Sequence, residues 1–265
     1  MDYHLHTVHS MDGRQTMEDL CAAMVAKGVQ EICLTEHIEP GHPGKGVDIP
    51  PVWDVWFQEI RDMREKFPML TIRSGIEIGD NPLCREETKR LLDTLPLDFR
   101  LLSLHLVNGV DCYDNEKYFT GKSRAQAYRE YAEAKVESVT DWTDFDSVAH
   151  IGYVAKFSVY TGQDRPLRYE DAPDAFDTLL RFMIEKGKCL EINTSGYGTT
   201  GDTLPHSSIV RRYIELGGEL FTFGSDSHDV GRDYADIERA KDAVRAMGGK
   251  YQAAFCQRER TLYRI

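Results

Sequence analysis

The sequence has 265 residues, of which 41% are hydrophobic and 10% aromatic, a composition typical of a folded globular chain with a substantial core. No run of residues approaches the length of a membrane span, and a formal net charge of −12 argues against a general nucleic-acid binder, which needs a basic surface. We therefore expect no membrane and no nucleic-acid partner. The excess acid serves either solubility or, in part, the binding of divalent cations.

The start of the chain predicts a cytoplasmic protein. A strand-like segment, Asp2–His6, begins at once and leaves no residues for a targeting sequence. The six cysteines form no CxxC pair, and Cys21, Cys33 and Cys189 lie within apolar patterns. We therefore expect reduced thiols that bind no metal.

Short apolar runs typical of β-strands alternate with segments of helical period. In chain order, the expected strands are Asp2–His6, Glu31–Thr35, Leu70–Ile78, Phe99–Leu106, Ser147–His150, Cys189–Thr194 and Leu220–Gly224. Apolar stripes of helical period occupy residues 17–25, 56–67, 128–136, 176–184 and 237–247. Thr16 and Asp19 are expected to cap the first helix, and Gly28 and Gly187 to end helices.

This alternation predicts an α/β fold with a parallel sheet. No linker-like run divides the chain, so we expect one domain over residues 1–265. No glycine motif of a dinucleotide- or nucleotide-binding fold occurs, and the length suits a closed barrel of about seven β/α units. The Gly/Pro-rich stretches 39–51 and 196–205 are expected to be long loops.

Imidazoles and carboxylates stand at the ends of nearly all the expected strands. They are His4 and His6, then His37, Glu77, His105 and His150, and finally Asp226 and His228, with Asp12 in the loop after the first strand. His4 with His6, and Asp226 with His228, have the i, i+2 spacing that places two side chains on one face of a strand. In α/β barrels the active site is built at the C-terminal ends of the strands.

Each of these residues has a simpler explanation when taken alone. His105 or His150 could be a hydrogen-bonded structural histidine, Glu77 half of an ion pair, and Asp12 a turn residue, while His42 is expected to be exposed in its loop. The joint pattern favours a metal centre, because so many buried imidazoles and carboxylates are costly without cations. Nine ligands, one of them bridging, suit two or three divalent ions of Zn²⁺, Mn²⁺ or Fe²⁺.

Several segments together resemble the polymerase and histidinol phosphatase (PHP) superfamily. The resemblance rests on the initial HxH and on the segments Ser10–Gly13, Thr35–His37, Ser103–His105, Ala149–Gly152 and Gly224–His228, together with the isolated Glu77. The segments Tyr113–Ser123 and Glu191–Gly196 favour its monofunctional histidinol-phosphatase branch.

This resemblance implies a distorted TIM-like (β/α)7 barrel with a trinuclear metal centre. His4, His6, Glu77 and Asp226 would hold the first metal, which Glu77 bridges to a second metal held by His105 and His150. Asp12, His37 and His228 would hold the third. The chain departs from the superfamily in two places: Glu36 replaces the usual Asp before His37, and the region after His150 lacks the usual Asp and Arg.

The expected reaction is the hydrolysis of a phosphate monoester, with L-histidinol phosphate as the expected substrate and a metal-bridging hydroxide as nucleophile. Glu77 and Asp226 are then catalytic residues, and His206 is either the proton donor and phosphate contact or a helix cap. Lys156 and Ser195 are candidate phosphate contacts. Asp111, Asp114 or Glu116 would meet the substrate ammonium, and the imidazole would lie among aromatic residues chosen from Trp53, Trp56, Tyr113 and Phe119.

Two alternatives remain open from the sequence. One is a phosphoesterase of the same superfamily that acts on another small ester, such as a nucleotide or sugar phosphate. The other is a metal-binding barrel without catalytic activity. Phosphate release from a panel of esters separates the three.

Overall fold

The computed structural model describes residues 1–44, 46–231 and 234–265, and it contains one large sheet and one small hairpin. The large sheet has nine strands in the order β1-β2-β3-β4-β7-β8-β9-β10-β11. Their bounds are Asp2–Leu5, Glu31–Ile38, Thr71–Gly79, Phe99–Ser103, Ser147–Val148, Cys189–Asn193, Leu220–Gly224, Tyr251–Cys256 and Glu259–Arg264. Neighbouring strands are parallel except β10 and β11. The hairpin pairs β5 (Leu106–Val107) with β6 (Val110–Asp111).

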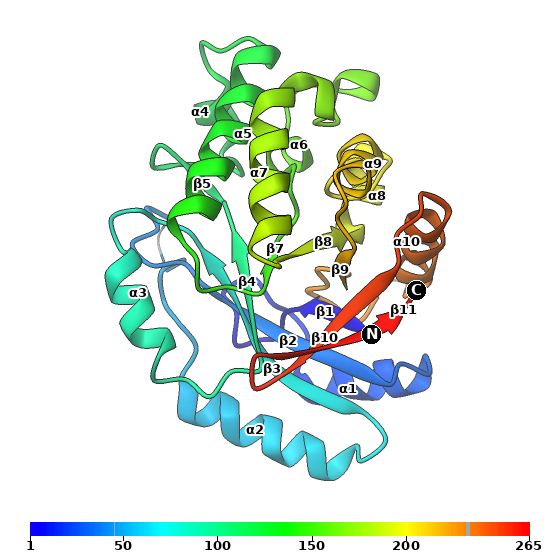
Figure 1. The fold of residues 1–265 in the computed structure, drawn as a ribbon. Coiled ribbons are helices and arrows are strands. Elements are labelled where there is room, and N and C mark those ends of the chain that lie inside the picture. The colour runs from blue at the N-terminus through cyan, green and yellow to red at the C-terminus, as the bar shows by residue number, and fades with distance from the viewer. Residues whose placement is uncertain (45, 232–233) are drawn as a thin grey trace.

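Ten α-helices are found among the described residues, most of them in the connections between strands. Helices α1 to α5 span Met17–Ala26, Trp53–Lys66, Arg85–Leu92, Asn115–Phe119 and Arg124–Asp141. Helices α6 to α10 span Tyr153–Lys156, Pro173–Glu185, Tyr197–Thr200, Ser207–Glu215 and Ala235–Ala246. Figure 1 shows the longer helices around the outside of the sheet, with α2 beside β3 and with α5 and α7 side by side.

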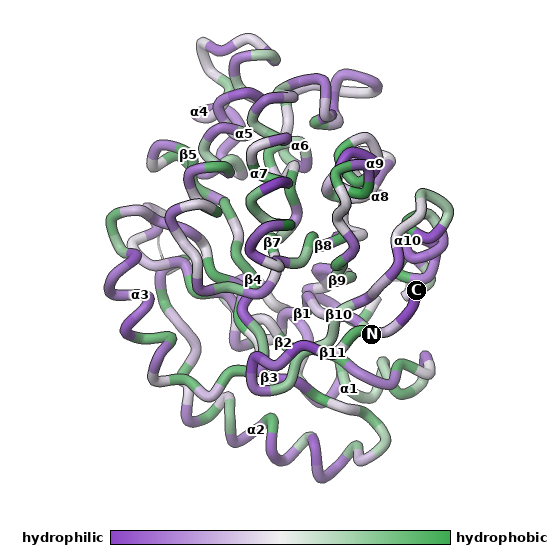
Figure 2. The backbone as a smooth tube through the Cα atoms, in the orientation of Figure 1, coloured by the Kyte–Doolittle hydropathy of each residue, from purple (hydrophilic) through white to green (hydrophobic). Residues whose placement is uncertain are grey.

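The helical stripes read from the sequence are confirmed as buried faces. In α1 the buried residues are Met17, Leu20, Cys21 and Met24, and in α7 they are Phe176, Leu179, Leu180 and Met183. Thr16 accepts a hydrogen bond from the Asp19 amide, as expected of a cap. Hydrophobic and hydrophilic residues alternate along α2 and α7 in Figure 2, as one-sided burial requires.

The expected closed barrel is not confirmed, because the hydrogen-bonded ladder of the sheet is open. Strand β10 pairs with the first two residues of β9, while β1 reaches only the segment that follows β9. There Leu5 bridges Ser227, and the Asp226 amide donates to the His4 carbonyl at 2.9 Å. Residues 4–6 and 226–228 therefore lie side by side although they come from opposite ends of the chain.

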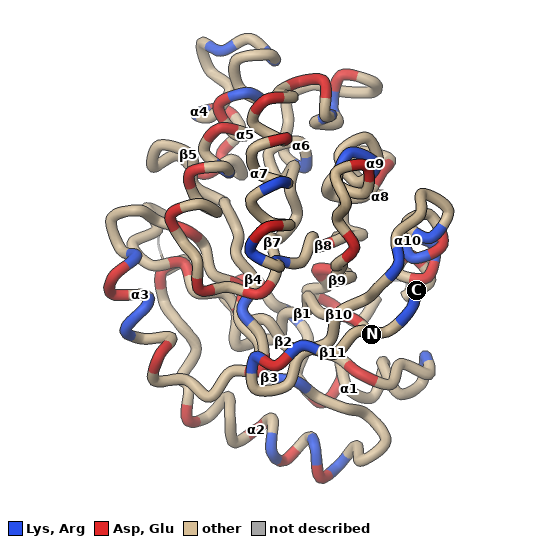
Figure 3. The backbone as a smooth tube through the Cα atoms, viewed as in Figure 1, with Lys and Arg blue, Asp and Glu red and all other residues tan. Residues whose placement is uncertain are grey.

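The sequence reading missed the C-terminal hairpin β10–β11. In β11 every residue is exposed, so no buried face marks it in the sequence. Of the two expected loops, residues 196–205 contain the short helix α8, and the loop 39–51 includes residue 45, which lies outside the described residues. Acidic and basic residues are interspersed along the outer helices (Figure 3), and none of the described helices is long and apolar enough to cross a membrane.

Candidate metal centre and active site

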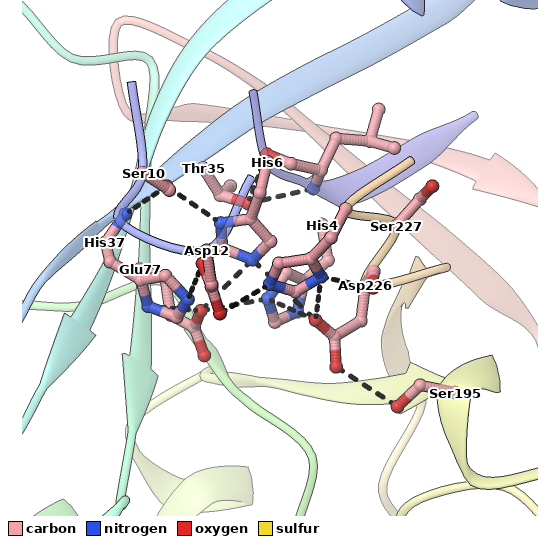
Figure 4. Close-up of polar contacts among 12 residues, drawn as sticks. His4, His6, Ser10, Asp12, Thr35, His37, Glu77, Ser195, Asp226 and Ser227 are labelled. Carbon is pink, nitrogen blue, oxygen red and sulfur yellow. Dashed lines mark hydrogen bonds and ion pairs between the residues drawn. The ribbon is translucent and has the colours of Figure 1, made fainter. Parts of the chain in front are cut away.

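All nine residues expected to bind metal converge on one point at the C-terminal ends of the parallel strands. His4 and His6 come from β1 and the residue after it, His37 from β2, and Glu77 from β3. His105, His150, Asp226 and His228 follow β4, β7 and β9, and Asp12 lies in the loop before α1. Figure 4 shows six of these residues pointing toward one another.

Glu77 stands at the centre of this cluster and contacts five imidazoles. Its Oε2 lies 3.1 Å from His4 Nε2, 3.3 Å from His6 Nε2 and 3.1 Å from His37 Nδ1. Its Oε1 lies 2.8 Å from His150 Nε2 and 3.4 Å from His105 Nε2, and it accepts a hydrogen bond from Ser103. The side chain of Glu77 is 1% exposed, so both carboxylate oxygens face other protein groups rather than bulk water.

Asp226 forms a second centre beside Glu77. Its Oδ1 lies 3.7 Å from both His4 Nε2 and His6 Nε2, while its Oδ2 accepts from Lys156 Nζ at 2.8 Å and from Ser195 Oγ at 3.1 Å. The backbone of Asp226 has φ of 55°, a left-handed conformation that is uncommon for a residue other than glycine. Such backbone conformations cluster at functional sites.

Asp12 lies at the solvent-exposed edge of the cluster and contacts two of its histidines. Its carboxylate lies 3.1 Å from His228 Nε2 and 3.6 Å from His37 Nε2, and its side chain is 52% exposed. The rings of His6 and His228 stack with centroids 4.3 Å apart, as do those of His6 and His37. The exposed carboxylate of Asp12 marks the side from which solvent and small molecules reach the buried part.

Burial and close neighbours shift the pKa values of the clustered residues. Burial alone would raise the pKa of Glu77, but the adjacent His4 and His37 hold it well below its usual range. Burial opposes protonation of His37, yet Glu77 and other acids raise its pKa to about 9. Burial and the neighbouring His37 and His228 lower the pKa of His6 to about 3. Carboxylate charge in this cluster is therefore balanced by protons on some of the imidazoles, the role that a divalent cation takes in a metal site.

Four triads within the cluster have one potential ligand atom from each residue within 4.8 Å of the others. The triads are His4/His6/Glu77, His4/His150/Asp226, His37/Glu77/His105 and His6/His37/His228. The triads share residues, and Glu77 belongs to two of them.

Sequence reasoning missed two buried glutamates that contact the imidazoles from behind. Glu39 Oε1 lies 2.7 Å from His105 Nδ1, and Glu191 Oε1 lies 2.5 Å from His4 Nδ1. Glu39 immediately follows β2, and Glu191 lies within β8. A carboxylate in an otherwise apolar strand was the available signal for Glu191, whereas Glu39 is hidden in a Gly/Pro-rich segment.

A cavity of about 280 Å³ opens onto the cluster. Besides the site residues, its lining includes Asp111, Tyr113, Tyr153, Lys156 and Phe157. His42, which was expected to be exposed, is instead buried at this cavity, where its Nε2 lies 3.2 Å from Asp111 Oδ2. The cavity thus joins a floor of clustered imidazoles and carboxylates, with Lys156 beside it, to a wall that carries Asp111 and several aromatic rings.

Other candidates from the sequence lie elsewhere. His206 caps α9, where its Nδ1 accepts from the Ser208 amide, and it is not among the residues that line the cavity. The helix-cap contact is therefore present, and the roles of His206 as proton donor and phosphate contact stay predictions. Trp56 and Phe119 are buried in the core, Trp53 packs against that core, and Asp114 pairs with Lys117 at the surface. Glu116 is exposed on α4.

Comparison with known proteins agrees with this geometry. The chain is 29% identical to a histidinol-phosphatase of Lactococcus lactis over 256 residues, 96% of this chain and 94% of that protein. It is 31% identical over 227 residues to a probable histidinol-phosphatase of Clostridium acetobutylicum, covering 86% of each chain. It superimposes with a TM-score of 0.91 on a crystal structure of the Lactococcus lactis histidinol phosphate phosphatase complexed with zinc, L-histidinol and phosphate, at 29% identity and 98% coverage of both chains.

The PHP domain family matches residues 2–195, which is most of the chain and includes seven of the nine clustered residues. The resemblance read from the strand-end motifs is confirmed by this match and by the full-length similarity to histidinol-phosphatases. The chain belongs to the PHP domain family.

Proposed function

We propose that the protein is a metal-dependent histidinol-phosphatase, which hydrolyses L-histidinol phosphate to L-histidinol and phosphate. One observation carries this proposal: nine ligand-type side chains, all but Asp12 buried or partly buried, form one cluster centred on Glu77 in a chain that matches a histidinol phosphate phosphatase from end to end. That relative was crystallised with zinc, L-histidinol and phosphate, which are a metal and the two products of this reaction.

The residues of the cluster fit divalent cations. His4 Nε2, His6 Nε2, His37 Nδ1 and Glu77 Oε2 are buried and have no hydrogen-bond partner among the described atoms, although they face one another. Buried polar atoms of this kind are rare unless something satisfies them, and neutral imidazole with carboxylate is a donor set that suits zinc, manganese or iron. We infer two or three such ions.

The superfamily pattern suggests how these ions are divided. His4, His6, Glu77 and Asp226 would hold the first, and Glu77 with His105 and His150 the second. Asp12, His37 and His228 would hold the third. When bound, divalent ions act as Lewis acids that lower the pKa of water toward ~7 and neutralise phosphate charge.

Lys156 and Ser195 are proposed to bind the phosphate at the edge of the cluster, beside Asp226. Both already donate to Asp226 Oδ2, so their donors lie at the edge of the metal cluster, and Lys156 also lines the cavity. Lys156 stands on α6, shortly after His150, in the region where the superfamily usually has an arginine. The lysine therefore supplies a cation from a different position, as a point charge rather than a bidentate fork.

The wall of the cavity suits the histidinol half of the substrate. Asp111 supplies the carboxylate for an ammonium group, and its Oδ1 accepts from the Tyr113 amide while Oδ2 faces His42. Tyr113, Tyr153 and Phe157 form a contiguous set of rings, with Phe157 4.9 Å from each of the two tyrosines. We propose that these rings flank the substrate imidazole.

We infer that the functional unit is the whole span 1–265 rather than the matched segment alone. Asp226 and His228 lie beyond residue 195, yet they belong to the same cluster as His4 and His6. The backbone bridge between Leu5 and Ser227 holds these two ends of the chain in register.

The test is phosphate release from L-histidinol phosphate and from a panel of nucleotide and sugar phosphates. It is measured with protein that a chelator has stripped of metal, and again after addition of Zn²⁺ or Mn²⁺. The proposal predicts metal-dependent turnover with the highest kcat/KM for L-histidinol phosphate. A higher kcat/KM for another ester contradicts the substrate. A protein that binds its full complement of metal and turns over no ester contradicts the enzyme.

A further inference from the structure

Three imidazoles of the cluster, those of His4, His6 and His105, are held from behind through their Nδ1 atoms. For His4 the partner is Glu191, whose Oε1 lies 2.5 Å from His4 Nδ1. The second oxygen of Glu191 accepts from the His150 amide at 2.6 Å and from Asn193 Nδ2 at 3.2 Å. Glu191 thus contacts two candidate ligands, His4 through its ring and His150 through its backbone amide.

Glu39 makes the corresponding contact on the other side of the cluster. Its Oε1 lies 2.7 Å from His105 Nδ1 and 3.3 Å from His37 Nδ1. The side chain is 3% exposed, so water does not compete for these contacts. Glu39 therefore holds the His105 ring by a hydrogen bond and lies beside the His37 ring, whose Nδ1 also faces Glu77.

His6 is held through a relay rather than directly. Its Nδ1 lies 3.2 Å from Ser10 Oγ, and this hydroxyl in turn donates to Glu36 Oε2 at 2.6 Å. Glu36 also accepts from the amide and the hydroxyl of Thr7. Because the hydrogen of Ser10 is directed at Glu36, its oxygen is left to accept from the His6 ring.

These contacts determine which ring nitrogen carries hydrogen. An ionised carboxylate only accepts, so His4 and His105 must present Nδ1–H to Glu191 and Glu39. Nε2 of each ring faces inward, His4 toward Glu77 Oε2 at 3.1 Å and His105 toward Oε1 at 3.4 Å, and in the neutral form of the ring this nitrogen presents its lone pair to a metal ion. His6 follows the same rule through Ser10, and its Nε2 lies 3.3 Å from Glu77.

Two glycines leave room for the glutamates. A Cβ at Gly79, at the end of β3, would collide with the carboxylate of Glu39. A Cβ at Gly224, at the end of β9, would collide with Glu191 and with His4 Cβ. Neither glycine has positive φ, so space and not backbone conformation requires glycine at these positions.

We propose that Glu36, Glu39 and Glu191 are positioning residues of the metal centre. They fix the tautomer and direction of His6, His105 and His4 and strengthen these imidazoles as ligands. The proposal rests on the metal centre of the proposed function. It also gives a role to the glutamate that departs from the superfamily pattern, because Glu36 anchors Ser10 while the neighbouring His37 points into the cluster.

The test is metal affinity, measured on the full chain by competition between the chelated protein and a chromophoric chelator for Zn²⁺. Glu191→Gln keeps size but places an amide N–H₂ at one of the two acceptor positions that Glu191 uses, and Glu39→Gln keeps size but removes the charge that accepts from His105. Each is expected to weaken zinc binding by about 10- to 100-fold. Ser10→Ala, which removes the relay without removing a charge, is expected to weaken it in the same direction.

Glu31→Gln is the matched control, because Glu31 is a buried glutamate at the start of β2 that contacts Tyr3 and Arg73 and none of the clustered histidines. In the zinc-loaded protein, ¹⁵N spectra of labelled histidine should show Nδ1–H for His4 and His105. Glu191→Gln should displace the His4 signal alone and Glu39→Gln the His105 signal, with melting temperatures of the chelated variants close to that of Glu31→Gln.

Unchanged zinc affinity in both variants, or an equal loss in Glu31→Gln, overturns the positioning role while leaving the proposed function intact. A wild-type protein that binds no zinc contradicts the metal centre itself. If a glutamine variant fails to fold, Ser10→Ala decides for His6, and unchanged affinity in that variant overturns the relay.

Discussion

Replacing Lys156 tests how the phosphate is held. Its ammonium lies 2.8 Å from Asp226 Oδ2 and lines the cavity, with its side chain 18% exposed. A hydrogen bond to a charged group contributes about 1.5–3 kcal/mol, and 1.36 kcal/mol corresponds to a factor of ten. Lys156→Met should therefore lower kcat/KM for L-histidinol phosphate by roughly 10- to 150-fold.

The same substitution should not weaken metal binding, because it removes a cation that competes for Asp226. Steady-state phosphate release gives kcat and KM, and metal analysis after gel filtration gives the bound ions. Lys156→Arg should restore part of the activity, and Lys188→Met, which removes a half-buried lysine bonded to the Phe145 carbonyl, should have no effect. A kcat/KM within threefold of wild type, or a loss of activity that follows loss of metal, refutes the phosphate role.

Three further predictions follow from burial and charge. Asp111→Asn should raise the KM for L-histidinol phosphate about tenfold or more, and it should leave the KM for phosphate esters without an ammonium group unchanged. Competition between the two classes of substrate measures this difference. Because Glu77 raises the pKa of His37 to about 9, metal binding at pH 8 should release protons, and zinc affinity should fall as pH drops below 9; calorimetry in buffers of different ionisation enthalpy tests this. Burial lowers the pKa of Lys135 from 10.5 to about 8, so Lys135→Met should stabilise the fold by up to about 3 kcal/mol below pH 8. That gain should vanish as pH rises toward 10.5, where the lysine is neutral in both states, and urea unfolding at pH 7 and pH 10 measures it.

The convergence of the nine residues was predictable because its signal is local. His4 and His6, two residues apart on one strand, must share a face, and a polar residue that ends an apolar parallel strand must lie at the same edge as its counterparts. Among the glutamates proposed to orient these side chains, Glu39 gave no such signal. Glu39 lies in a Gly/Pro-rich stretch, and its contact with His105 depends on the space that Gly79 leaves.

The fold was predictable to the extent that the spacing of apolar residues indicates which faces of the helices and strands are buried. The seven expected strands are present, some of them shorter than expected, because buried parallel strands are apolar throughout. Whether a sheet closes depends on tertiary register, which no local pattern encodes; here the sheet stays open, and Leu5 bridges Ser227 beyond the end of β9. The burial of His42 was also missed, because it depends on a contact with Asp111, which lies in a hairpin far away in the sequence.

The central claim is that metal held around Glu77 hydrolyses L-histidinol phosphate. The most direct measurement is the rate of phosphate release from this ester by wild type and Glu77→Gln, each chelated and then reconstituted with Zn²⁺ or Mn²⁺. The account predicts turnover only for reconstituted wild type, with the activity of Glu77→Gln at background and its bound metal reduced. Turnover by the chelated wild type, or substantial activity in Glu77→Gln, would contradict it.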